Sequence, residues 1–155
     1  MIKCGGGDDG LYEDRKFQQN IQGALANGIQ VGVYFYSGAS NAREAYDEAS
    51  YCISLIRDYQ ITYPVAFDWE LDGDYDSVTE ACETFCNVIS SYGYQPMVYS
   101  NRNRWYNNFD GEKIASKYKV WMAAYFGKFY YDSVRWTYGD DLPNFRYHYD
   151  MWQYS

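Results

Sequence analysis

The chain alternates short apolar runs with amphipathic ones, and this alternation constrains its fold more than any other feature. Most of the amphipathic segments have the apolar spacing of helices, and each lies between two runs rich in β-branched or aromatic residues. Strands that alternate with helices pair in parallel, with the helices packed against the sheet. The sequence therefore predicts an α/β protein with six strands: MIKCG, IQVGVYFYS, YPVAFDWE, YQPMVYSN, KVWMAAY and YDMWQYS.

The helical segments carry start and stop signals. Asn41 is expected to cap the second helix, and Ser77 and Glu80 have the spacing of a capping box at the start of the third, which Gly93 is expected to end. The apolar spacing is lost between residues 126 and 149, where an aromatic loop is predicted. Helices are predicted over residues 15–28, 41–59, 77–93 and, as a short one, 110–118.

Length and charge restrict the classes of protein that fit. A chain of 155 residues suits one domain with one core, so a single domain is expected over residues 1–155. A net charge of −8 argues against binding to nucleic acid or to an anionic membrane. No run approaches the roughly 18 apolar residues that a membrane-spanning helix needs. The opening MIKCGGGDDG lacks the pattern of a secretory signal peptide.

Two acids follow an apolar strand in the stretch YPVAFDWE. Side chains two apart in a strand share a face, so Ala66, Asp68 and Glu70 lie opposite the bulky set that includes Phe67 and Trp69. The acids then lie at the carboxyl end of a parallel strand, where α/β barrels place their chemistry. Close carboxyls raise the pKa of one of them, which leaves a proton donor beside an anion, as glycoside cleavage requires. Spacing alone equally allows two solvated acids at a strand-to-loop junction.

Aromatic residues gather near the same predicted strand ends. The chain has 20 Tyr, 8 Phe and 5 Trp, more than one core of this size can bury, so some belong on a binding surface. Core packing explains any one of them better than ligand binding does. Together with two acids, however, a set of rings suits a sugar chain, whose C–H faces stack on aromatics. The candidates for such contacts are Tyr34, Tyr36, Tyr99, Trp121, Tyr125, Trp152 and Tyr154.

Two metal patterns are weaker. The stretch DGDYDSVTEACE places acids at four positions of a calcium-binding loop, namely Asp72, Asp74, Asp76 and Glu83. Ser77 occupies the position where such a loop needs glycine for its sharp turn. Cys82 and Cys86 share a helix face, but the chain's one histidine, His148, is distant in sequence. Buried reduced thiols, and no metal or organic cofactor, are therefore expected.

The ordered series GVYFYS, YPVAFDWE, QPMVYSN, VWMAAY and WQYS resembles the glycoside hydrolase family 25 lysozymes, the muramidases of Chalaropsis type. The resemblance runs from about Ile2 to Ser155. It implies a TIM-like (β/α) barrel that hydrolyses the β-1,4 bond between N-acetylmuramic acid and N-acetylglucosamine in peptidoglycan. It implies Glu70 as general acid/base, and Asp68 either as a group that assists the substrate's N-acetyl group or as the nucleophile. The implied substrate-binding residues are Tyr34, Tyr99, Trp121, Tyr125 and Gln153, the last from a Trp-Gln-Tyr signature.

The chain also departs from the family pattern. Members open with a strand of the form Gly-Ile-Asp-Val-Ser and close with one such as Val-Asp-Leu-Asn, and neither stretch occurs in this sequence. Lys3 also stands where an arginine is usual. An incomplete barrel with about six of its eight strands is therefore expected, with two copies pairing through the open edges. Two alternatives are a non-catalytic peptidoglycan-binding remnant and a glycosidase for another N-acetylated glycan such as chitin. The expected place of action is the cell wall, for a secreted enzyme or a phage lysin.

Overall fold

The computed structural model describes residues 1–71, 77–125, 130–132, 135–137 and 144–154. Its strands are β1 (Ile2–Gly6), β2 (Tyr12–Glu13), β3 (Val33–Ser37), β4 (Val65–Trp69), β5 (Pro96–Asn101), β6 (Lys119–Ala123), β7 (Tyr130–Asp132), β8 (Arg135–Thr137) and β9 (Met151–Gln153). Its helices are α1 (Phe17–Ala26), α2 (Ala42–Ile56), α3 (Val78–Ser91), α4 (Arg102–Asn107) and α5 (Gly111–Ala115).

One seven-stranded sheet organises the protein, in the order β2-β1-β3-β4-β5-β6-β9. All six predicted strands are present in it and pair in parallel, and β2 adds an antiparallel edge beside β1. The α/β prediction is therefore confirmed. The strands follow one another as in a TIM-like barrel, but the sheet is not closed, since β2 and β9 end it on its two sides. No helix among the described residues is long and apolar enough to cross a membrane.

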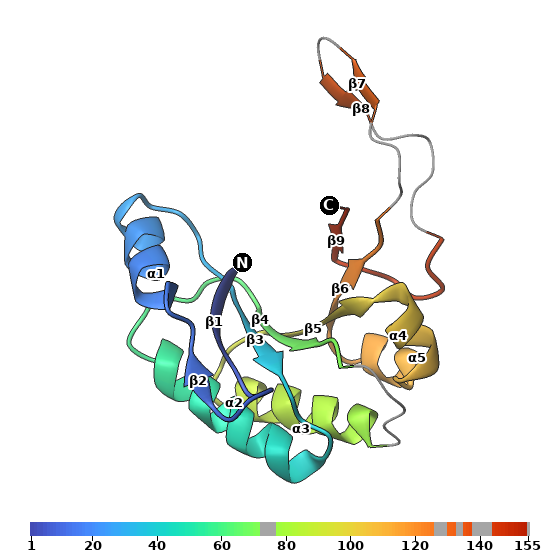
Figure 1. Ribbon diagram of the computed structural model, residues 1–155, viewed down its shortest axis with the longest axis horizontal. Helices are drawn as coiled ribbons and strands as arrows, with labels where there is room; N and C mark the ends of the chain where they lie inside the picture. Colours follow the sequence, from blue (N-terminus) through green and yellow to red (C-terminus); the bar gives the residue numbers. More distant parts are fainter. Residues whose placement is uncertain (72–76, 126–129, 133–134, 138–143, 155) are drawn as a thin grey trace.

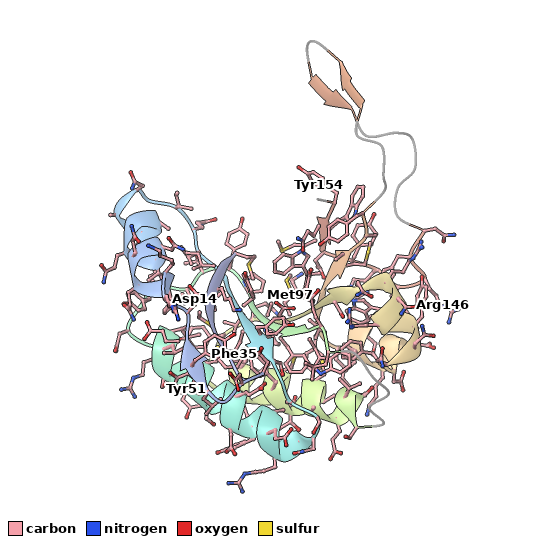
Figure 2. All side chains as sticks on the ribbon, viewed as in Figure 1. Asp14, Phe35, Tyr51, Met97, Arg146 and Tyr154 are labelled. Atoms are coloured by element: carbon pink, nitrogen blue, oxygen red, sulfur yellow. The ribbon has the colours of Figure 1, made fainter. Side chains whose placement is uncertain are left out.

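The helices cover one face of this sheet. Helices α2 and α3 run side by side against its middle, with α1 near one edge and α4 and α5 near the other (Figure 1). We call the opposite face the inner face. Figure 2 shows Phe35 and Tyr51 on the helix side and Met97 on the inner side. Strand alternation produces this division, because it sends successive side chains to opposite faces.

The core lies between the sheet and the helices. Phe35 and Phe67 point into it from neighbouring strands and meet Phe85 of α3, with ring centroids 6.2 and 5.1 Å apart. Trp69 is fully buried and its indole N–H donates to the carbonyl oxygen of Ala39. The bulky face predicted for the fourth strand is thus the core face, which leaves Ala66 and Asp68 on the inner face.

Helix ends follow the predicted signals in two cases and not in a third. The Asn41 side chain accepts from the backbone N–H of Glu44 at 3.1 Å, and Gly93 has the positive φ that ends α3. The capping box predicted for Ser77 and Glu80 is wrong. The Ser77 hydroxyl donates instead to the carbonyl oxygen of Ser40, so a tertiary hydrogen bond replaces the local cap.

Four short elements were not predicted. Strands β7 and β8 form a separate antiparallel pair inside the segment predicted as a loop, which corrects that prediction. Each has three residues, too few to show a period. Strand β2, with two residues, is shorter still. Helix α4 has the sequence RNRWYN, which carries no amphipathic pattern; it is held by an Asn101 cap and by the burial of Trp105.

A buried carboxyl, Glu48 of α2, holds the end of β3. Its side-chain oxygens accept from the Ser37 hydroxyl at 2.5 Å and from the backbone N–H of Gly38 at 2.8 Å. A methyl group at position 7 would collide with this carboxyl, so the segment that packs against Glu48 requires glycine at this position. Burial is the main cause that raises the pKa of Glu48 from its ordinary 4.5 to about 7. The position of β3, and of the inner-face residues on it, thus depends on this carboxyl.

We expect Glu48→Gln to reduce the pH dependence of stability. The folded state holds the Glu48 proton up to about pH 7, whereas the unfolded chain releases it near pH 4.5. The free energy of unfolding therefore falls as the pH rises across this window, by on the order of 2 kcal/mol for this group. Glutamine mimics the protonated acid and does not titrate. Urea unfolding at pH 5 and pH 8 measures the difference.

The control for this variant is Asp47→Asn, which changes an exposed acid on the same helix that pairs with the exposed Arg43 at 3.1 Å. Its pH dependence should equal that of the unmodified protein, because exposed ion pairs contribute little. A Glu48→Gln variant whose stability fell between pH 5 and 8 as steeply as that of the unmodified protein would contradict the expectation.

Candidate active site

The strand register places one row of side chains across the inner face. The Cα partners run from Tyr36 on β3 to Asp68 on β4, Tyr99 on β5, Trp121 on β6 and Met151 on β9. Successive strands lie about 4.8 Å apart, so the flanking side chains are direct neighbours of the carboxyl. The acid predicted from the sequence therefore lies between two tyrosines.

Asp68 is almost fully enclosed, with 5% of its surface exposed. Its Oδ1 atom forms no hydrogen bond with any described residue. Burial, and then the negative charge of Glu70, raise the pKa of Asp68 from its ordinary 3.8 to about 8, against the opposing positive charges of Lys3 and Arg104. In the free protein this carboxyl therefore carries a proton at neutral pH, and its Oδ1 atom is available to accept a hydrogen bond from a ligand.

Glu70 follows β4 directly and is partly buried. Its charge raises the pKa of Asp68, Tyr36 and Tyr99, so its carboxylate lies near the middle of the row. Burial is the first cause of the raised pKa of both tyrosines, which keeps their hydroxyls neutral and able to donate hydrogen bonds. The structure thus gathers two acids and two neutral phenols in one place.

The predicted aromatic residues meet over this row. Trp121 contacts Tyr99 with ring centroids 4.6 Å apart and Tyr34 at 6.2 Å. Strands β3 and β6 are three steps apart, about 14 Å in a flat sheet, so the rings reach inward over the curved inner face. The Tyr99 hydroxyl is hydrogen-bonded to Tyr125, which is 59% exposed. These four residues are thus brought together, as the sequence suggested.

Gln153 lies in the next row, two residues farther along the strands. Its Cα partner is Ala123 on β6, whose own partner on β5 is Asn101. Glu70 is also two residues beyond the Asp68 row, on a strand that pairs with β5. The glutamine therefore shares the inner face with the acids but lies three strands away from β4.

Two cations at the site were not identified as functional from the sequence. Lys3 of β1 lies with its Nζ atom 4.8 Å from the ring centroid of Tyr36 and 5.5 Å from that of Tyr12. Arg104 of α4 donates to the backbone of Glu70. The alternation within MIKCG could have placed Lys3 on the inner face. No sequence signal could have placed Arg104, because its helix was not predicted.

The metal patterns receive no support from the described residues. Asp72, Asp74 and Asp76 of the calcium-like pattern lie outside them. Glu83 is bound by two lysines of the α5 region, Lys113 at 2.6 Å and Lys117 at 2.5 Å. Within the described part of the chain, no group of three His, Cys, Asp or Glu side chains could hold a metal ion. The four cysteines are buried free thiols, as predicted.

The arrangement can carry out acid-catalysed bond cleavage. Two neighbouring carboxyls hold one proton between them near neutral pH, so the site offers a proton donor and an anion at the same time. The aromatic rings beside them provide flat apolar surfaces, and the neutral tyrosines provide hydrogen-bond donors. A polyhydroxylated substrate with apolar C–H faces matches this combination.

The chain is similar to lysozymes, autolysins and endolysins of phages and bacteria. The chain is 29% identical over 135 residues to the lysozyme of Streptococcus phage Cp-1. This match covers 81% of the present chain and 36% of the phage protein. The autolysin LytC of Streptococcus pneumoniae, solved with a synthetic peptidoglycan ligand, superposes with a TM-score of 0.69 at 26% identity, over 79% of this chain and 31% of that one.

A glycosyl hydrolase 25 of Streptococcus pneumoniae, GHIP, has the same fold. It superposes with a TM-score of 0.77 at 18% identity, over 99% of this chain and 66% of that one. The present chain spans only about a third of the length of the phage lysozyme that it matches, 36%. The sequence profile of the glycosyl hydrolases of family 25 matches residues 1–155. The chain therefore belongs to glycosyl hydrolase family 25.

Proposed function

We propose that the protein is a peptidoglycan hydrolase, an N-acetylmuramidase that cleaves the β-1,4 bond between N-acetylmuramic acid and N-acetylglucosamine. The observation that carries this proposal is the buried Asp68 carboxyl beside Glu70, in register between Tyr36 and Tyr99. The family and its lysozyme relatives support the substrate class. The place of action that follows from this substrate is the bacterial cell wall.

In this proposal Glu70 is the general acid/base. The proton that the two acids share lies on Glu70 when the substrate is bound, and it passes to the glycosidic oxygen as the bond from that oxygen to the sugar C1 breaks. The oxygen of the substrate's N-acetyl group bonds to C1, and the unpartnered Oδ1 of Asp68 accepts the N–H of that group. Glu70, now a carboxylate, then takes a proton from the water that attacks C1, and the bond from C1 to the acetyl oxygen breaks, which restores the N-acetyl group. Direct attack by Asp68 on C1 is the second route to the same product.

The rings of Tyr34, Tyr99, Trp121 and Tyr125 are the proposed sugar contacts, with Gln153 farther along the inner face. Clearing of a bacterial cell-wall suspension tests the activity, and mass spectrometry of the products tests the bond. Reducing-end N-acetylmuramic acid is expected. Reducing-end N-acetylglucosamine would show cleavage of the other glycosidic bond of the peptidoglycan strand. Cleavage of chitin instead of cell walls would assign the protein to another N-acetylated glycan. Retention on cell walls without any cleavage would assign it to binding alone.

We further propose that two copies associate through the outer strands of the open sheet. Strand β9 pairs with β6 on one side, and its other side forms no ladder with any described strand. The edge of an open sheet is a place where a second chain can add a strand of its own. Size-exclusion chromatography with light scattering should give twice the mass of the 18.2 kDa chain. A monomer that persists at high protein concentration would exclude this association.

A further inference from the structure

Glu70 lies beyond the backbone ladder that joins β4 to β5. That ladder pairs Val65 with Pro96 at one end and Asp68 with Tyr99 at the other, and it stops there. The next three residues, 69 to 71, therefore have no Cα partner on β5. Since the site depends on where the Glu70 carboxyl points, something else must fix this segment on the β5 side.

Side chains from the β5–α4 segment take over where the ladder ends. The buried Ser100 hydroxyl donates to the carbonyl oxygen of Trp69 at 2.7 Å. The Arg104 guanidinium then donates from Nη2 to the carbonyl of Glu70 at 2.6 Å and from Nε to the carbonyl of Leu71 at 3.0 Å. Three consecutive carbonyls are thus bound by two side chains, in the order of the sequence.

The arginine is itself held in place. Its backbone N–H donates to the Asn101 side chain at 3.0 Å, which fixes the first turn of α4 on the end of β5. The next residue, Trp105, is fully buried against Phe109 and Phe145. The guanidinium is planar and presents its donors in a fixed fork, so both carbonyls are bound in one geometry. The β5–α4 connection is therefore built to hold the strand end.

We propose that Arg104 is a positioning residue for Glu70, one that fixes the backbone of the general acid by binding two successive carbonyl groups. The inference rests on the proposed function for its catalytic consequence, but the backbone contact can be tested without any activity. The positive charge of Arg104 also opposes the rise in the pKa of Asp68, so the same side chain acts on both acids. Arg104 needs no contact with the substrate for either effect.

The test compares Arg104→Gln and Arg104→Lys with the control Arg102→Gln. Arg102 begins the same helix, is exposed, and has one long contact to the carbonyl of Asn144 at 3.4 Å. On soluble glycan strands we expect Arg104→Gln to lower kcat at least about tenfold with little change in KM, since a small displacement of a catalytic group is costly. Lysine keeps the charge but cannot bind both carbonyls in a planar fork, so it should restore only part of kcat.

Amide hydrogen exchange provides the readout that is independent of activity. Amides of residues 69–71 should exchange at least about tenfold faster in Arg104→Gln than in the Arg102→Gln control, while the core strands stay protected. Unchanged exchange and kcat in Arg104→Gln would overturn the proposal, as would full restoration of kcat by lysine. If Arg104→Gln does not fold, Arg104→Lys replaces it in the test, because lysine keeps the charge and one hydrogen bond. Its kcat and the amide exchange of residues 69–71 are then compared with those of Arg102→Gln. An unmodified protein that cleaves no glycan would refute the proposed function, while the exchange data would still decide whether Arg104 fixes the backbone.

Discussion

Replacing Glu70 by glutamine is expected to lower the rate of cell-wall clearing by roughly three orders of magnitude. Glutamine keeps the size of the side chain and its backbone contacts with Arg104. It cannot give a proton to the glycosidic oxygen, nor take one from water in the second step. Because Glu70 is only partly buried, the fold should be unaffected. Turbidity measurements with matched protein concentrations, checked by circular dichroism, give the result.

The matched control is Glu112→Gln, which removes one negative charge from an exposed position on α5. Clearing by this variant should equal that of the unmodified protein, so a general effect of net charge is separated from the loss of the acid. Clearing that survived in Glu70→Gln would show that another group donates the proton. The leading candidate would then be Asp68, which already holds one at neutral pH.

The inner face could be predicted from the sequence because it depends on a local rule. Alternation along YPVAFDWE put Asp68 opposite Phe67 and Trp69, and the parallel order of strands then brought Tyr99 and Trp121 alongside. The aromatic residues followed from the same rule, since each lies on, or just after, a strand that was recognised from its composition. The six parallel strands and the three long helices required nothing beyond period and flanking glycines.

What the sequence could not reveal depends on contacts between distant segments. Ser77 has a capping pattern, yet its hydroxyl binds Ser40, 37 residues away in sequence. Arg104 belongs to a helix of six residues with no apolar period. Neither this helix nor the hydrogen bond from Arg104 to the carbonyl of Leu71, just after β4, could therefore be predicted. The enclosure of Asp68 likewise depends on rings from neighbouring strands. Spacing alone had left its pKa, and the choice between a working acid and a solvated one, undecided.

Asp68→Asn is expected to change activity and stability in opposite directions. Activity should fall by about two orders of magnitude, because asparagine cannot ionise and so cannot stabilise the positive charge that develops at the sugar. Stability should rise at alkaline pH. The folded protein holds the Asp68 proton up to about pH 8, whereas the unfolded chain loses it near 3.8. The contribution of this group to the free energy of unfolding is therefore complete below pH 3.8 and is lost as the pH rises through 8.

Asparagine does not titrate, so the stability difference between variant and unmodified protein should increase from pH 5 to about pH 8 and level off above it. Chemical denaturation at several pH values measures it, and clearing assays on the same samples measure the loss of activity. Glu48 titrates with the same sign and is unchanged in both proteins, so it cancels in the comparison. A difference that stayed constant with pH would mean that Asp68 is ionised in the folded protein. In that case the two acids would not share a proton, and Glu70 would have to hold a proton of its own to act as the general acid.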